Sequence, residues 1–408
     1  MLQRRRHVFH IAGYDPIRPA QQYRRFVREL AIFQEIWGTR ATLSDMTESS
    51  GYFSWNVRTE GANWTGNADY ELLAWDDIVA KDAGGGDGPR LVRAIATYLD
   101  LLWTGTLFRY AVAHTRYFLF ALFPLFQLAF LGFCSWIAAV LGVWTLDLHG
   151  LQKLTFVSLI GTAIFFLLLR WPGRHWKLQH ALDDWILARA YLYGQRSDVQ
   201  SRLEAFSERL TRRVKEGGID EILIVGHSLG ALFAVEVVAR ALQADPNLGR
   251  RGVALCVLTV GATIPKCTLH PAAAHIRDRI LQVAQEPSIY WAEYQARADA
   301  ISFYRFDPVK LQRMTGKSDQ LNGSPVIRRV QIQDMLRKET FAKYRFHVLR
   351  LHYQFVMANN RRSSYDYFMM ICGPIAFQQW STSPLGLLDF FGEKGDAKVV
   401  DHEVIRPA

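Results

Sequence analysis

The sequence predicts an α/β fold, in which a mostly parallel sheet is flanked by helices and interrupted by an inserted helical hairpin. Two observations carry this prediction. Short apolar runs typical of buried strands alternate with longer stretches of helical periodicity, and such alternation favours a parallel sheet. Between the two halves of this pattern, no charged residue occurs from Tyr117 to Leu146, and a second apolar run follows from Leu154 to Leu169.

The first half of the pattern predicts three strands and two helices. Pro19–Trp37 is expected to be a helix, because its aromatic and aliphatic residues recur every three or four positions. A further helix begins at Arg90 and leads into the apolar segment. Strands are expected at Arg6–Gly13, Tyr52–Thr59 and Tyr70–Ile78.

The second half begins with two helices, Lys177–Tyr193 and Val199–Glu216. The latter is followed by Gly217-Gly218, and glycine is the usual residue just after a helix C-terminus. Another helix is expected over Ala231–Leu242. The strands of this half are expected at Ile222–Val225, Val253–Val260, Ser288–Ala296 and Val326–Ile332.

The hairpin is expected to cross a membrane. The first run is longer than the roughly 20 residues that span a bilayer. The second, Leu154–Leu169, comes into range with Leu151 and Trp171 if Lys153 extends to the interface. A buried pair of core helices is the alternative. The positive-inside rule places both outer ends in the cytoplasm, because basic residues flank the hairpin at Arg109, Arg116, Arg170, Arg174 and Lys177.

The expected organisation is therefore a multi-pass membrane protein with its α/β domain on the cytoplasmic side. Residues 1–116 and 172–391 form the two parts of that domain, 117–171 the transmembrane hairpin, and 392–408 a polar, flexible tail.

Composition supports a membrane as the partner. The 48 Lys and Arg exceed the 38 Asp and Glu, and the net charge of +10 favours an anionic neighbour. No basic stripe with interleaved aromatics and no nucleic-acid motif occurs, so nucleic acid is not expected. The four cysteines lack C-x-x-C spacing and are expected to be free thiols. No metal or nucleotide motif is present, so no cofactor is expected.

The most informative segment is Gly226-His227-Ser228-Leu229-Gly230, between an apolar strand and a helix. This is the setting of a G-x-S-x-G nucleophile elbow. Side chains at Gly226 and Gly230 are expected to collide with the neighbouring strand and helix, and Ser228 is expected to project from the helix N-terminus, where an oxyanion is favoured. A bare match to three residues can arise by chance, but the flanking strand and helix favour a true elbow.

A serine nucleophile needs a histidine base and a carboxylate that orients it, in the chain order Ser, acid, His. Asp299, which follows the expected strand Ser288–Ala296, is the first candidate for the acid. Asp307 also ends an apolar run and is the competitor. Whichever of the two is not the acid is expected to cap a loop.

His347 and His352 are the candidates for the base, and His402 is set aside because it lies in the tail. If residues 344–355 form one helix, five residues separate the two histidines by roughly 140°, so only one can face Ser228. His352 is preferred.

The oxyanion hole is expected to use the backbone N–H of Leu229 and a donor from the turn Gly13-Tyr14-Asp15, with Tyr14 as the candidate. The alternative for that turn is an ordinary Asp-Pro turn.

These segments resemble the α/β-hydrolase superfamily, in its lipase and esterase branch. The resemblance lies in the elbow motif, in Trp291–Asp299 and in His352–Phe355. Gly13–Pro16 and Ile371–Pro374 resemble bacterial membrane-anchored members. The resemblance implies a Ser-Asp-His triad and an acyl-enzyme intermediate, and it favours Asp299 and His352. No His-Gly-Gly-Gly oxyanion loop is present.

The expected function is that of a membrane-anchored serine hydrolase, similar to esterases or lipases, acting on acyl esters or lipids. An acyltransferase with the same triad and a non-catalytic membrane scaffold are the alternatives. Substrate identity and oligomeric state stay open.

Overall fold

The computed structural model describes residues 2–49, 51–144, 146–316 and 319–398. Two compact units divide the chain. Unit 1 comprises the residues up to Val79 and those from Ser197 onward, and unit 2 comprises Ala80–Arg196. Unit 2 is therefore an insertion into the sequence of unit 1.

A mostly parallel sheet forms the centre of unit 1, as the sequence predicts. Its order over the described residues is β11-β8-β7-β6-β1-β5-β4-β2, and β3 pairs with β4. Neighbours from β11 to β5 are parallel, whereas β4 is antiparallel to β5, β2 and β3. The strands of this sheet are β1 (Leu2–Ile11), β2 (Arg40–Leu43), β3 (Thr47–Ser49), β4 (Tyr52–Glu60), β5 (Trp64–Leu72), β6 (Glu221–His227), β7 (Ala254–Val260), β8 (Ile289–Ala296) and β11 (Val326–Val330). A separate pair consists of β9 (Phe306–Asp307) and β10 (Gln312–Arg313).

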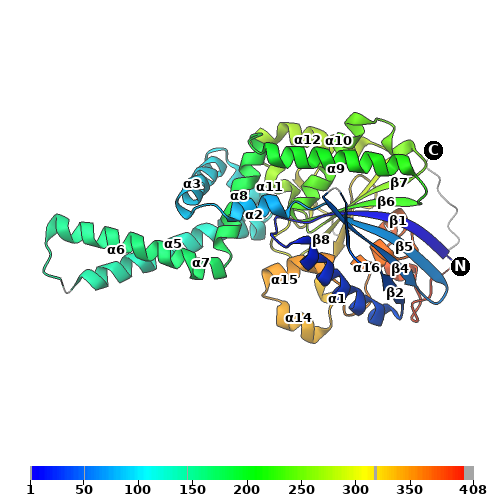
Figure 1. Cartoon of the computed structure of the whole chain (residues 1–408), viewed down its shortest axis with the longest axis horizontal. Coiled ribbons are helices and arrows are strands. Elements are labelled where there is room, and N and C mark those ends of the chain that lie inside the picture. Colours follow the sequence, from blue (N-terminus) through cyan, green and yellow to red (C-terminus); the bar gives the residue numbers. More distant parts are fainter. Residues whose placement is uncertain (1, 50, 145, 317–318, 399–408) are drawn as a thin grey trace. The chain divides into compact units, whose positions relative to one another are not determined.

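Helices cover both faces of this sheet (Figure 1). One face carries α9 (Ser197–Glu216), α10 (Leu229–Ala244) and α12 (Ala274–Gln285), and the other carries α1 (Pro19–Trp37) and α16 (Tyr367–Cys372). Smaller helices of unit 1 are α2 (Asp76–Ala83), which extends into unit 2, α11 (Ile264–Thr268), α13 (Ile332–Met335), α14 (Lys338–Tyr344), α15 (Val348–Tyr353) and α17 (Phe377–Thr382). Short 3₁₀ helices occur at Leu248–Arg250, Pro271–Ala273, Gln354–Val356 and Gly386–Asp389.

The buried centre of the sheet explains why β6 is apolar along its length. Each residue of β6 is buried, because helices cover both faces and strands pair on both edges. A strand in this position is typically a continuous apolar run. The carboxyl ends of β1, β6, β7 and β8 consequently meet at one edge of the sheet.

One expected strand is wrong at its end. The segment Tyr70–Ile78 was expected to be extended throughout, but β5 ends at Leu72 and α2 begins at Asp76. Asp76 and Asp77 occupy the first turn of α2, where carboxylates interact favourably with the helix dipole.

Unit 2 is helical throughout its described elements and extends beyond the expected hairpin of 117–171. Two of its segments, Thr115–Trp144 and Gly150–His175, are long and apolar enough to cross a membrane, with mean hydropathies of 2.0 and 1.9. Helices before and after them pack in the same unit. The helices are α3 (Asp87–Trp103), α4 (Thr106–Ala113), α5 (Thr115–Trp144), α6 (Gly150–Arg170), α7 (Pro172–His175) and α8 (Leu178–Leu192).

The expectation of a flexible tail from residue 392 is wrong for its first seven residues. Residues 392–398 are folded against unit 1, because Trp64 donates its indole N–H to the carbonyl of Gly395 at 2.9 Å. Asn63 also exchanges two hydrogen bonds of 2.7 Å with the backbone of Ala397. Residues 399–408, which include His402, lie outside the described part of the chain.

Candidate active site

Ser228 lies on a strained turn between β6 and α10. Its backbone has φ 57° and ψ −124°, a conformation that is costly for a residue with a side chain. Two hydrogen bonds hold the turn in place. The N–H of Ser228 donates to the carbonyl of Val260 at 3.2 Å, and the N–H of Thr263 donates to the carbonyl of Ser228 at 3.3 Å.

The two motif glycines are required sterically, as the sequence predicts. A Cβ on Gly226 would lie 2.5 Å from the Cα of Ala231, at the start of α10. A Cβ on Gly230 would lie 2.3 Å from the carbonyl oxygen of Ile11 and 2.4 Å from that of Ala12. These contacts are with backbone, which cannot rotate away, so glycine permits the close approach of α10 to the end of β1.

Asp299 and His352 form a buried pair beside this turn. Asp299 follows β8 in the chain, and His352 lies in α15. Nδ1 of His352 is 2.8 Å from Oδ2 of Asp299, while Oδ1 of Asp299 accepts the N–H of Ile301 at 3.0 Å. Both side chains are nearly inaccessible to solvent. With Asp299 ionised, Nδ1 carries the proton, and Nε2 therefore presents a lone pair.

Nε2 of His352 is buried and has no hydrogen-bond partner among the described residues. The pair and the elbow meet at the turn after β7. The carbonyl of Val260 binds the N–H of Ser228, and a Cβ on the next residue, Gly261, would lie 3.2 Å from Cε1 of His352 and 3.3 Å from Oδ2 of Asp299. A buried ring nitrogen without a partner reduces stability, and such groups are found preferentially at functional sites.

The competing acid and base lie in other surroundings. Oδ1 of Asp307 accepts the N–H groups of Val309 and Lys310 at 2.9 and 3.0 Å, so it caps a loop, as expected of the carboxylate that is not paired with histidine. His347 is exposed at the N-terminus of α15.

Residues 344–355 do not form one helix, so the condition on which the separation of roughly 140° depends is not met. The segment breaks between α14, which ends at Tyr344, and α15, which begins at Val348, because a turn closes there through the N–H of His347 and the carbonyl of Tyr344.

His227, to which the sequence assigned no role, packs against the pair. Its Nε2 is 3.1 Å from the carbonyl oxygen of His352, and the two ring centroids are 4.5 Å apart. Burial, together with repulsion from His352, lowers the pKa of His227 well below its usual value. The ring is therefore neutral, and its N–H holds the backbone of α15 beside the elbow. Its place in the elbow motif was the available signal.

The turn after β1 lies against the serine side chain. A Cβ on Gly13 would be 2.8 Å from Cβ and 3.3 Å from Oγ of Ser228. The next residue, Tyr14, is buried. Leu229 is the first residue of α10, so its N–H has no acceptor within that helix. The two segments expected to supply oxyanion donors thus approach Ser228 from different elements.

Asp15 connects this turn to the histidine helix. Its Oδ2 accepts the hydroxyl of Tyr353, the residue after His352, and its Oδ1 accepts the N–H of Ile17 at 3.2 Å. Arg25 lies over the ring of Tyr353 at 5.3 Å. Asp15 therefore forms a local turn and also positions the turn relative to α15.

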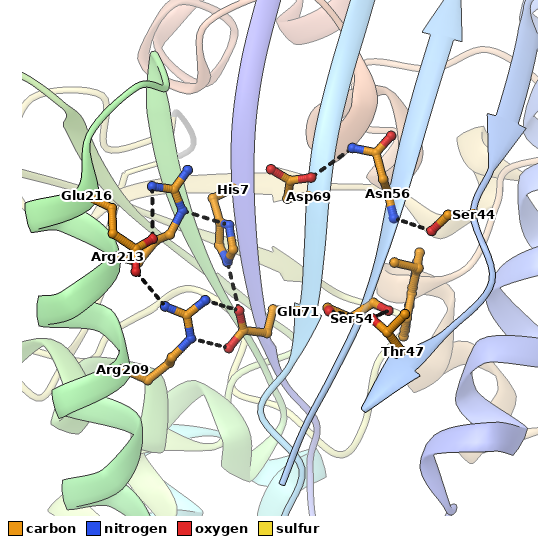
Figure 2. Close-up of a pocket in the computed structure, with 11 residues that line it drawn as sticks. His7, Ser44, Thr47, Ser54, Asn56, Asp69, Glu71, Arg209, Arg213 and Glu216 are labelled. Carbon is orange, nitrogen blue, oxygen red and sulfur yellow. Dashed lines mark hydrogen bonds and ion pairs between the residues drawn. The ribbon is translucent and has the colours of Figure 1, made fainter. Parts of the chain in front are cut away.

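A separate polar pocket of about 470 Å³ lies on unit 1, away from the elbow (Figure 2). His7 in its wall pairs with Ile222 at the start of β6, whereas Ser228 follows the end of that strand. Arg209 makes two hydrogen bonds to Glu71, of 2.9 and 2.8 Å, and His7 lies 3.2 Å from the same carboxylate. These internal pairs account for the charged groups at its centre.

No set of three or more His, Cys, Asp or Glu side chains within the described ranges is arranged to hold a metal ion. Comparisons of the chain with protein-family models, with curated proteins and with solved structures gave no match.

Proposed function

We propose that this chain is a membrane-anchored serine hydrolase that cleaves acyl esters through Ser228, Asp299 and His352. The observation that carries the proposal is the buried His352–Asp299 pair of 2.8 Å beside a serine on a strained strand–helix turn, with Nε2 of His352 unpaired within the described part of the chain. The buried pair, the unpaired Nε2 and the strained turn each reduce stability, and acyl transfer by a serine nucleophile uses all three.

The reaction begins with proton transfer. Nε2 of His352 takes the hydroxyl proton of Ser228 as Oγ attacks the ester carbonyl carbon, and the carbonyl π electrons move onto oxygen. Asp299 keeps Nδ1 protonated and stabilises the imidazolium. When the tetrahedral intermediate collapses, the bond to the alcohol oxygen breaks, and the alcohol leaves with the proton from Nε2. The acyl group is then esterified to Ser228.

Deacylation repeats these steps with water. His352 takes a proton from water as its oxygen attacks the acyl carbon, and the proton passes to Oγ of Ser228 when the carboxylic acid leaves. The oxyanion formed in both halves is stabilised by the N–H of Leu229, by a donor from the Gly13–Tyr14 turn, and by the N-terminal end of the 16-residue α10.

We further propose that α5 and α6 span the membrane and that unit 1 faces the cytoplasm. Support for the spans is their length and apolar composition, and support for the orientation is the basic flanks of the hairpin. Anchoring concentrates the enzyme where membrane-dissolved esters lie, which favours lipid or other long-chain acyl esters as substrates.

The proposal is tested by fluorophosphonate labelling of the detergent-solubilised full chain. Labelling of the wild type should be lost in Ser228→Ala and strongly reduced in His352→Ala. His347→Ala is the matched control and should label normally, because His347 is exposed and lies outside the pair. Normal labelling of Ser228→Ala, or none of a folded wild type, would overturn the assignment of the nucleophile.

A further inference from the structure

Helix α3 has an apolar face that the described fold leaves uncovered. Its buried side, which includes Ala94, Tyr98 and Leu101, packs in unit 2, where the rings of Tyr98 and Trp185 of α8 lie 6.1 Å apart. The opposite side is exposed, and apart from Arg93 it carries apolar residues that recur every three or four positions: Val92, Ile95, Ala96, Leu99, Leu102 and Trp103.

The exposure is large for side chains of this kind. Val92 is 68% exposed, Leu102 65% and Trp103 93%. Helix α4, which packs on α3 and α5, adds Phe108 at 73% and Val112 at 56%. A contiguous patch of this kind on a folded protein marks an interaction surface.

Hydrogen bonds fix α3 at the end of the hairpin where both long helices meet the rest of unit 2. Asp87, the first residue of α3, accepts the guanidinium of Arg170, the last residue of α6, at 3.0 Å. Further along α3, the hydroxyl of Tyr98 donates to the carbonyl of Ala121 in α5 at 2.9 Å. Figure 1 shows α3 running across the direction of α5 and α6, rather than along it.

The length of α5 relates this level to a bilayer. Its 30 residues span about 45 Å at 1.5 Å per residue, which matches a bilayer with its headgroup regions. At the same rise per residue, Ala121 lies about 9 Å along the helix axis from the start of α5. That depth is near the boundary between headgroups and acyl chains.

The surroundings carry the residues that suit this boundary. Trp103 and Trp171 are both exposed, and tryptophan is enriched at membrane interfaces. Basic residues at the same end of the unit are exposed as well: Arg93, Arg109, Arg116, Arg170, Arg174 and Lys177. Positive charge beside an apolar helix face favours a surface of anionic lipid.

We propose that α3 and α4 lie in the plane of the membrane interface, with the apolar face of α3 among the upper acyl chains of an anionic leaflet. The inference rests on the proposed insertion of the hairpin and is independent of the chemistry at Ser228. The membrane contact of unit 2 is then a broad platform around two spans. Lipid is favoured over a second protein copy, because the face lies at the level of the hairpin ends and exposed basic residues lie at the same end of the unit.

The test measures the depth of single fluorescent probes in the full chain, reconstituted in vesicles of equal parts phosphatidylcholine and phosphatidylglycerol. Cys134→Ser removes the partly accessible native thiol, and the other cysteines are buried. Probes are attached at Leu99→Cys on α3, Phe133→Cys in α5 and Ser201→Cys on α9. Ile95→Cys repeats the α3 measurement if the first variant misfolds.

We expect lipids with a doxyl group near the headgroup to quench the α3 probe most, lipids with a deep doxyl group to quench the Phe133 probe most, and neither to quench the Ser201 probe. Quenching at Phe133 without quenching at Leu99 would overturn the platform and leave the hairpin in place. Quenching at neither would overturn the membrane insertion as well. A Leu99 probe shielded from iodide and from lipid quenchers, but self-quenched between labelled copies, would assign the face to a second copy instead. Fluorophosphonate labelling of the same vesicles reports on the hydrolase proposal separately.

Discussion

Replacing Asp299 with asparagine should inactivate the protein without unfolding it. The reason is that the amide moves the proton of His352 from Nδ1 to Nε2. Asp299 has two acceptor oxygens in use, one for the N–H of Ile301 at 3.0 Å and one for Nδ1–H of His352 at 2.8 Å. Asparagine has one. That single oxygen keeps its hydrogen bond with the buried N–H of Ile301, since an unpaired backbone donor is costly. The amide NH₂ then points at Nδ1, and His352 must carry its proton on Nε2.

A histidine protonated on Nε2 cannot accept the proton of Ser228. The equivalent change in a serine protease lowers kcat by about 10⁴, which corresponds to about 5 kcal/mol of transition-state stabilisation. We expect a loss of the same order for Asp299→Asn, with thermal unfolding close to that of the wild type, because the amide fits the same space and keeps the Ile301 bond.

The assay is hydrolysis of p-nitrophenyl butyrate by the detergent-solubilised full chain, followed over several enzyme concentrations. Asp307→Asn is the matched control. Its single amide oxygen can still accept both Val309 and Lys310, so activity should be unchanged. A folded Asp299→Asn protein with most of its activity, or an Asp307→Asn protein that loses as much, would refute this assignment of the acid.

Three further predictions concern other parts of unit 1. Gly13→Ala should lower kcat, because the added Cβ would lie 2.8 Å from Cβ of Ser228 and displace that side chain. We expect a loss of roughly 100-fold, the order found when a reacting group moves by about 1 Å. Steady-state kinetics of the folded variant check this. Tyr353→Phe removes the bond to Asp15 and should lower kcat more than it changes KM, since the turn and α15 lose their connection; unchanged kcat would contradict this role. Burial raises the pKa of Glu293 from 4.5 to about 7, so folding takes up a proton and stability falls as pH rises from about 4.5 to 7. Glu293→Gln should abolish that fall and increase stability at pH 8 by about 3 kcal/mol, at roughly 1.4 kcal/mol per pKa unit; thermal unfolding at pH 5 and pH 8 measures the difference.

Short-range patterns were sufficient for the elbow and for the long elements. The strand, turn and helix of residues 221–235 are contiguous, so the steric demand on Gly226 comes from neighbours in the chain, whereas that on Gly230 comes from Ile11 and Ala12 at the end of β1. Helix α1 has the bounds that its apolar period indicates, Pro19–Trp37. Local sequence is sufficient to recognise both features, although the close approach of Gly230 to β1 depends on the fold.

Short-range patterns placed Asp299 and His352 first but left Asp307 and His347 as alternatives. Asp299 and Asp307 both end apolar runs, and they differ only in which groups meet their oxygens. His347 and His352 differ because the helix breaks between α14 and α15, and no proline or glycine marks that break.

Arg6 shows most clearly that burial cannot be predicted from neighbouring residues in the sequence. It stands in a basic cluster that suggests an exposed segment, yet it is buried. Its guanidinium donates to the carbonyls of Met370 at 2.6 Å and of Ile375 at 2.8 Å, more than 360 residues away. Burial of an arginine depends on such partners, and nothing near it in the sequence identifies them.

The position of β1 between β5 and β6 has a consequence for synthesis. β5 begins about 50 residues after β1 ends, whereas β6 begins about 150 residues after β5 ends. At about 5–20 residues per second, the ribosome needs on the order of ten seconds to make that stretch. During this time one edge of β1 lacks its partner, and open strand edges promote aggregation. The apolar helices emerge before β6, so on the proposed anchoring the central sheet closes only after the chain is tethered to the bilayer.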